Sequence, residues 1–193
     1  MVVKRTHQQS GFALMVAVVL MAVFAILATI ITMSLSGDND QERIEKVADE
    51  LHRISSAMDS GGAGSFMNDM PRYPKNLSAL THRIAATDLQ CTGNKYAGGD
   101  VAKWKGPYYP VPIDPAGHYL APGFVVSNTI IYTTTKPQDL RLQIPNVSLS
   151  DANLLDIEVD GVSDLANGIV TYSSTGPSIG TVFYRAAIPA NSC

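Results

Sequence analysis

The stretch GFALMVAVVLMAVFAILATIITMSLS, residues 11–36, decides the fold that this sequence predicts. No Asp, Glu, Lys or Arg occurs from Phe12 to Ser36. An α-helix rises about 1.5 Å per residue, so this run would reach about 37 Å and cross a hydrocarbon core of about 30 Å. We therefore expect a long N-terminal helix whose first half spans a membrane.

Charges on the two sides of the apolar run predict its orientation. Lys4 and Arg5 precede the run, whereas Asp38 and Asp40 follow it. Basic residues favour the cytoplasmic side of a membrane. The N-terminus is therefore expected in the cytoplasm, and the C-terminal part of the chain on the opposite side.

The composition of the chain limits the classes of protein to which it can belong. It has 193 residues, 14 Lys+Arg against 17 Asp+Glu, and a formal net charge of −3. Charged residues make up 16%, below the roughly 25% of ordinary soluble domains. A chain of this length can bury a core, and its acidic balance offers no basic stripe to nucleic-acid phosphates.

Three processing histories are compatible with the N-terminal segment. A signal peptidase would cut after a small-x-small motif such as Ala25-Ile-Leu-Ala28, which would leave a chain beginning near Thr29. An uncut signal anchor would keep the whole apolar run. The third history follows from the junction between the polar leader and the apolar run.

That junction, Gly11-Phe12-Ala13-Leu14, resembles the one found in type IV pilins and pseudopilins. The resemblance implies that prepilin peptidase cuts between Gly11 and Phe12 and that Phe12 becomes N-methylphenylalanine. It also implies a single-pass bacterial inner-membrane protein with a periplasmic head, in contact with inner-membrane lipid and with other pilin-like subunits. The expected parts are a leader at 1–11, a transmembrane and assembly helix at 12–36, an amphipathic continuation at 37–60, and a globular α+β head at 61–193.

Val16 departs from the pattern of the family. Most members carry Glu at this position, where the carboxylate neutralises the N-terminal amine of a neighbouring subunit. An unpaired charge in lipid is costly, so Val16 suits the bilayer but removes this docking contact. Either lineage variation or a minor subunit at the filament tip accounts for the difference.

The rest of the chain predicts an amphipathic helix followed by a small sheet. Apolar residues recur at spacings of three and four along one helical stripe, at Ile44, Val47, Leu51, Ile54 and Met58. The expected fold is α+β and pilin-like, with the long helix packed on a small antiparallel sheet. The predicted strands cover residues 123–134, 140–147, 154–159, 168–173 and 181–188, and a short helix is expected at 77–87. Residues 140–144 alternate between apolar and polar, which predicts one wet face, and Pro145 predicts an edge position for the end of its strand.

Two further segments strengthen the resemblance. Residues 73–80 (YPKNLSAL) and 103–119 (KWKGPYYPVPIDPAGHY) are similar to segments of the major pseudopilins of type II secretion. The aromatic side chains of Trp104, Tyr108 and Tyr109 are expected to lock an irregular loop against the helix. This similarity favours a major subunit, which conflicts with what Val16 suggests.

The two cysteines, Cys91 and Cys193, predict a disulfide. An even count in an exported domain favours pairing, and the bridge would fasten the C-terminus. Two free thiols are the alternative.

An acidic stretch contains the candidates for a metal site. Asp156, Asp160 and Asp164 supply the hard oxygen ligands that calcium prefers, and major pseudopilins bind calcium in a C-terminal loop. The spacing does not match an EF-hand, so solvated acidic side chains are the alternative and no cofactor is required.

No catalytic motif is present, because the four histidines form no zinc pattern and the sequence lacks a nucleophile elbow or a P-loop. The expected function is therefore a non-enzymatic structural subunit of a type II secretion pseudopilus or a type IV pilus. The alternative is a periplasmic or surface binding domain, held by a signal anchor or released by signal peptidase.

Overall fold

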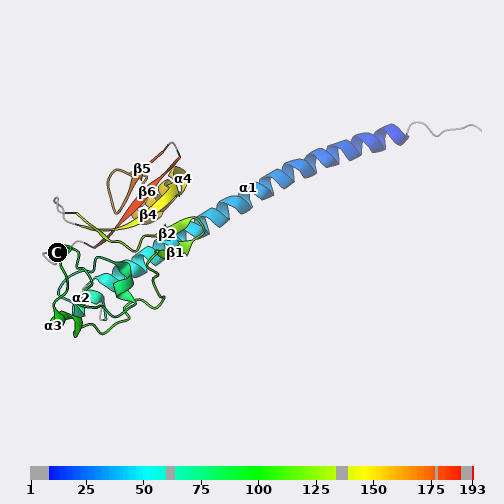
Figure 1. Ribbon diagram of the computed structural model, residues 1–193. Coiled ribbons are helices and arrows are strands. Elements are labelled where there is room, and N and C mark those ends of the chain that lie inside the picture. The colour runs from blue at the N-terminus through cyan, green and yellow to red at the C-terminus, as the bar shows by residue number, and fades with distance from the viewer. Residues whose placement is uncertain (1–8, 60–63, 134–138, 177, 188–192) are drawn as a thin grey trace, which may run out of the picture. The chain divides into compact units, whose positions relative to one another are not determined.

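A computed structural model describes the chain apart from residues 1–8, 60–63, 134–138, 177 and 188–192 (Figure 1). The side chains of residues 9–15 and 25–38 are also outside the described set. Contacts divide the chain into two compact units, residues 1–42 and 43–193, which we describe separately. Most of the predicted leader at 1–11 lies outside the described residues.

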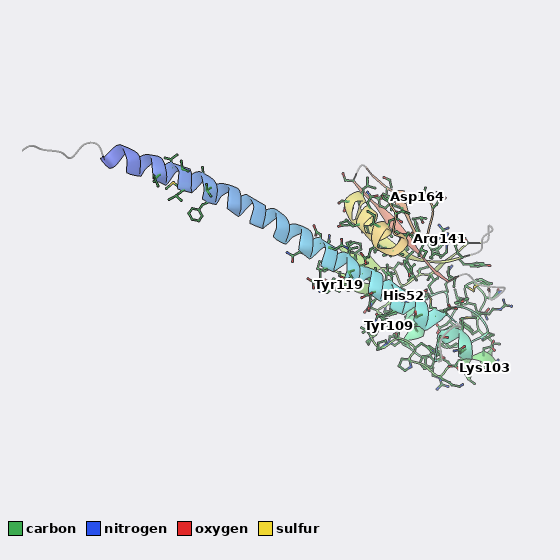
Figure 2. All side chains as sticks on the ribbon, turned by 180° about the vertical axis from the view of Figure 1, so that it is seen from behind. His52, Lys103, Tyr109, Tyr119, Arg141 and Asp164 are labelled. Carbon is green, nitrogen blue, oxygen red and sulfur yellow. A yellow bond between two sulfur atoms is a disulfide. The ribbon has the colours of Figure 1, made fainter. Side chains whose placement is uncertain are left out.

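The first unit consists of the N-terminal part of helix α1, which runs from Gln9 to Met58 over 50 residues. Its described apolar side chains lie between Val16 and Phe24, and all of its large ones are exposed. Met21 is 73% exposed and Phe24 is 67% exposed. Figure 2 shows side chains projecting from this part of the ribbon on more than one side.

The prediction that the first half of the N-terminal helix is an apolar membrane span is contradicted. A span needs about 20 consecutive, mostly apolar residues. Among the helical residues that the structure describes, no helix combines that length with that apolarity.

The second unit begins with the last part of α1, and here the predicted stripe is confirmed. Ile44, Val47, Leu51 and Ile54 have no exposed surface, as is also true of Met58. They belong to one apolar core, which draws on every region of the unit and includes Phe66, Leu77, Phe124, Leu142 and Val182.

The strands form two antiparallel sheets, as the α+β prediction requires. A hairpin pairs β1 (His118–Ala121) with β2 (Phe124–Val126). A four-stranded sheet has the order β3-β4-β6-β5, with all neighbours antiparallel. Its strands are β3 (Ile131–Tyr132), β4 (Leu140–Ser148), β5 (Val170–Ser174) and β6 (Ile179–Ala187).

One predicted strand is wrong, and one prediction about a strand end is confirmed. Residues 154–159 lie in helix α4 (Leu149–Asp160), because the Ser148 hydroxyl caps its start and Gly161, with φ of 76°, ends it. Pro145 lies in the second half of β4, where β6 is the one strand of this sheet that pairs with it, because β3 pairs only with Leu140 and Arg141. The edge position predicted for this strand end is therefore confirmed. A register shift between Ile144 and Val147 accommodates the missing N–H of this proline.

Apart from α4, the helical segments in the described connections are short turns. Helix α2 spans Phe66–Asp69, and α3 spans Gly98–Val101. The helix predicted at 77–87 is reduced to a 3₁₀ turn, η1, at Leu77–Leu80. Helix α4 contacts β4, β5 and β6, as Figure 1 shows.

The predicted disulfide between Cys91 and Cys193 is confirmed. The two residues are 102 positions apart in sequence, and their Cα atoms are 5.9 Å apart. Arg72 adds a hydrogen bond from Nη1 to the carbonyl oxygen of Cys193, at 3.4 Å. Structural disulfides are typical of proteins in oxidising compartments.

We predict that Leu51→Ala lowers the free energy of unfolding by about 2–5 kcal/mol, since it leaves a cavity in the core. The neighbouring substitution His52→Ala removes an exposed side chain and should change it by less than about 0.5 kcal/mol. Urea denaturation measures both. Equal effects of the two substitutions would contradict the burial of the stripe.

We also predict that Cys193→Ser lowers the free energy of unfolding by about 2–5 kcal/mol, because the unfolded chain loses its cross-link. A reducing agent should lower the unfolding midpoint of the unsubstituted chain and leave that of Cys193→Ser unchanged. A chain whose stability does not respond to the reductant would not contain the bridge.

Candidate functional site

A buried polar cluster fixes the loop at 103–119 to α1. The Tyr109 hydroxyl donates to Glu50 Oε1 and lies 3.2 Å from His118 Nε2. The same histidine nitrogen lies 3.4 Å from Glu50 Oε1. Tyr109 is 3% exposed and His118 is 7% exposed, so these polar atoms satisfy one another away from water.

The other aromatic residues of this loop are also used in packing. Trp104 donates from Nε1 to the Ala79 carbonyl at 3.0 Å. Its ring meets Tyr108 edge to face at 5.6 Å, and Tyr108 meets Phe66 in the same way at 5.4 Å. The predicted structural role of the aromatic cluster is confirmed.

The aspartates proposed for calcium lie on α4 and on the loop that follows it. Asp156 is fully buried, and its Oδ2 accepts a hydrogen bond from the Asp164 amide at 2.6 Å. Asp160 accepts from the amides of Ile169 and Val170. These carboxylates therefore hold the loop at 161–169 along the edge of β5.

Asp164 also stabilises this loop, because its carboxylate accepts hydrogen bonds from the Ala166 amide and from Asn167 Nδ2. Within the described ranges, no group of three or more His, Cys, Asp or Glu side chains is arranged to hold a metal ion. Calcium binding by these residues stays a prediction.

The carboxyl group of Asp156 is perturbed by its surroundings. Burial raises its pKa, and the charges of Asp160 and Asp164 add to the rise, against the opposing effect of the Asp164 amide. Its Oδ1 is buried without a hydrogen-bond partner in the described part of the chain. An ionised carboxylate here is unfavourable in the folded state.

An arginine pair that the sequence analysis did not single out lies on the outer face of the sheet. Arg141 on β4 and Arg185 on β6 are direct cross-strand partners. Asp139, which has no exposed surface, accepts from Arg141 Nε and Nη2 and from Arg185 Nε at 3.0–3.2 Å. The alternation of residues 140–144 signals the outward direction of Arg141, but nothing local indicates its pairing with Arg185.

The electrostatics of this cluster keep Asp139 ionised. Burial alone would raise the pKa of Asp139, but hydrogen bonds from Arg141 and Thr133 hold it below its usual range. The buried carboxylate therefore fixes the two guanidinium groups in place.

The residues predicted for processing and assembly lie in the first unit. Gly11 and Phe12 are in the first turns of α1, and their side chains are outside the described residues. Val16 begins the described part of the apolar stretch and is 41% exposed. We call residues 16–24 the apolar helix surface.

Comparison with protein-family models, with curated proteins and with solved structures finds no match to this chain.

We predict that Asp156→Asn raises the unfolding midpoint at pH 7. The pKa of Asp156 is raised on folding, so its stabilising form is the protonated one, present below the unfolded pKa of about 3.9 and lost as pH rises through the folded value. Asparagine imitates the protonated form, so its advantage should shrink toward pH 4.

Thermal unfolding between pH 4 and pH 7, in the presence of a chelator, measures the effect. The chelator is needed because bound calcium would favour the ionised carboxylate. Asp59→Asn, at an exposed position, is the matched control. A destabilised Asp156→Asn chain at pH 7, or a difference that is independent of pH, would contradict the assignment.

Proposed function

We propose that the chain is a pilin-like structural subunit that assembles with other pilin-like subunits into a type II secretion pseudopilus or a type IV pilus. The observation that carries the proposal is the apolar helix surface. Its large side chains are exposed on Val16, Val18, Val19, Leu20, Met21, Val23 and Phe24. Large apolar patches on soluble chains mark interaction sites.

The physical basis of assembly is the removal of this surface from water. Burial of apolar area contributes roughly 25 cal/mol per Å², so several valine and leucine side chains supply several kcal/mol per contact. Ala17 and Ala22 lie among the large side chains and are themselves exposed. Small residues at such positions allow two helix backbones to approach closely.

We further propose that prepilin peptidase releases the leader between Gly11 and Phe12 and that Phe12 is methylated. The resemblance of the junction at 11–14 to that of the pilins supports this step. We also propose a periplasmic location for residues 43–193, which the disulfide of this unit supports, because disulfides are typical of oxidising compartments.

Two features of the sequence bear on whether the chain is a major or a minor subunit, and they point in opposite directions. Val16 provides no carboxylate for the N-terminal amine of a neighbouring subunit, which favours a minor subunit. The similarity of residues 103–119 to major pseudopilins favours the main subunit of the filament.

We predict that the mature protein begins at methylated Phe12 and that Gly11→Leu retains the leader. A peptidase that reads a glycine cannot accept a branched side chain at the same position. Intact mass and N-terminal sequencing of the protein from its native cells measure both results.

Gly99→Ala is the matched control, since a side chain at Gly99 meets no atom within 4 Å. It should be processed as the unsubstituted chain is. A mature start near Thr29, or an intact Met1 in the unsubstituted chain, would contradict the proposal. Either result would support the binding domain that is anchored or released by signal peptidase.

A further inference from the structure

The arginine pair lines a groove on the outer face of the four-stranded sheet. The groove has a volume of about 590 Å³, within the range of about 300–1,000 Å³ that is typical of ligand pockets. Its wall and floor include Arg141, Arg185, Phe183, Thr171 and Asn167. The side chains of Arg141 and Arg185 are 30% and 28% exposed, so part of each is open to solvent and to a partner.

The two guanidinium groups keep unused hydrogen-bonding capacity. Asp139 engages Nε and Nη2 of Arg141 but only Nε of Arg185. Within the described residues, no hydrogen bond reaches Nη1 of Arg141 or either terminal nitrogen of Arg185. Two positive charges against one negative charge leave the groove with a surplus of one.

The two guanidinium groups are held in place before a ligand arrives, which makes their surplus positive charge more effective in binding. Like charges directly opposite each other on a sheet are destabilising unless a counter-charge is present. Asp139 supplies that charge from the buried side, and it fixes the guanidinium groups in advance. An incoming carboxylate therefore loses less ordering entropy than it would with two free arginines.

A complementary surface lies on α1 within the same unit. Glu45 and Asp49 are exposed and four residues apart, so they share one face of the helix. In the part of the chain that the structure describes, neither carboxylate takes part in an ion pair or a side-chain hydrogen bond. Their neighbours Ile44 and Val47 face the core, so this acidic face points away from it.

We propose that the arginine groove binds the Glu45–Asp49 face of α1 of a second copy of this chain. The proposal rests on the function proposed above, because it names the contact between heads of adjacent subunits. The spacings agree. Side chains four apart on a helix have Cβ atoms about 5–6 Å apart, and cross-strand partners have Cα atoms about 4.5–5.5 Å apart.

Each guanidinium group then donates hydrogen bonds to one carboxylate, and the two terminal nitrogens of Arg185 can form the two parallel bonds of a bidentate pair. Phe183 and Thr171 on the groove floor contact the aliphatic part of the incoming side chains. The contact is heterologous, since the groove of one copy meets the helix of the next, and such contacts propagate along a filament.

A double-mutant cycle on the full chain tests the proposal. Two differently tagged copies are expressed together in the native cells, and the amount of one that purifies with the other measures self-association. We expect the helix variant, Glu45→Gln with Asp49→Gln, to reduce it about tenfold. We expect a similar loss for the groove variant, Arg141→Gln with Arg185→Gln.

The combined variant decides whether the two surfaces touch. If they do, the four substitutions together lose no more than either pair alone, because the contact is already absent. Losses that multiply would overturn the proposal, as would a helix variant that associates normally. The helix variant is informative even if the groove variant unfolds, because Glu45 and Asp49 are exposed and the described residues of the head give them no ion pair or side-chain hydrogen bond.

Matched controls separate this contact from general charge effects. Lys103→Gln removes a cation at a place distant from Arg141, as Figure 2 shows, and Asp59→Asn removes an exposed carboxylate. Both should leave self-association within twofold of the unsubstituted chain.

Val19→Asp separates the two proposals, because it removes assembly through the apolar helix surface without touching the groove. If Val19→Asp abolishes association while the helix variant has no effect, the proposed function stands and this contact is wrong. A chain that does not self-associate at all overturns this contact, whereas the proposed function is tested separately by the mature start at Phe12.

Discussion

The burial of one stripe of α1 is the constraint on which the rest of the second unit depends. Ile44, Val47, Leu51 and Ile54 are withdrawn completely from water, and each contributes about 1.5–3 kcal/mol of hydrophobic stabilisation. The irregular segments that follow α1 have few hydrogen-bonded strands of their own, so this stripe gives them a surface on which to pack. Arg43, beside the stripe, reinforces the arrangement through an ion pair with Asp151 at the start of α4, at 2.6 Å, and through its position over the Phe124 ring.

Patterns that depend on neighbours in sequence could be predicted from the sequence. The helical stripe, the outward direction of Arg141 and the pairing of the only two cysteines follow from periodicity and counting. The strand predicted at residues 154–159 was wrong because β-branched residues there outweighed the capping signals at Ser148 and Gly161, which define a helix. The edge position predicted at Pro145 is confirmed, because β3 pairs only with the start of β4. The register shift beside this proline has no local signal in the sequence.

The candidate sites were less predictable, since they depend on contacts between distant segments. Asp156, Asp160 and Asp164 are alike in sequence, yet only Asp156 is buried, and the first two carboxylates hold a loop that returns to the sheet. The membrane span was inferred from the apolar run alone, and no described helix meets its requirements. The pairing of Arg141 with Arg185 depends on the register of β4 and β6, and residues 44 positions apart carry no local signal of it.

The disulfide also limits how far a mechanical force can extend the chain. Cys91 and Cys193 are 102 positions apart, and each extended residue spans about 3.3–3.6 Å, so roughly 340–370 Å of contour length is locked inside a covalent ring. All of the strands from β1 to β6 lie within that ring. A pull applied between α1 and the C-terminus therefore lengthens the chain only through residues that precede Cys91. The force therefore acts on the packing of α1 against the core, and not on the strands of the sheet.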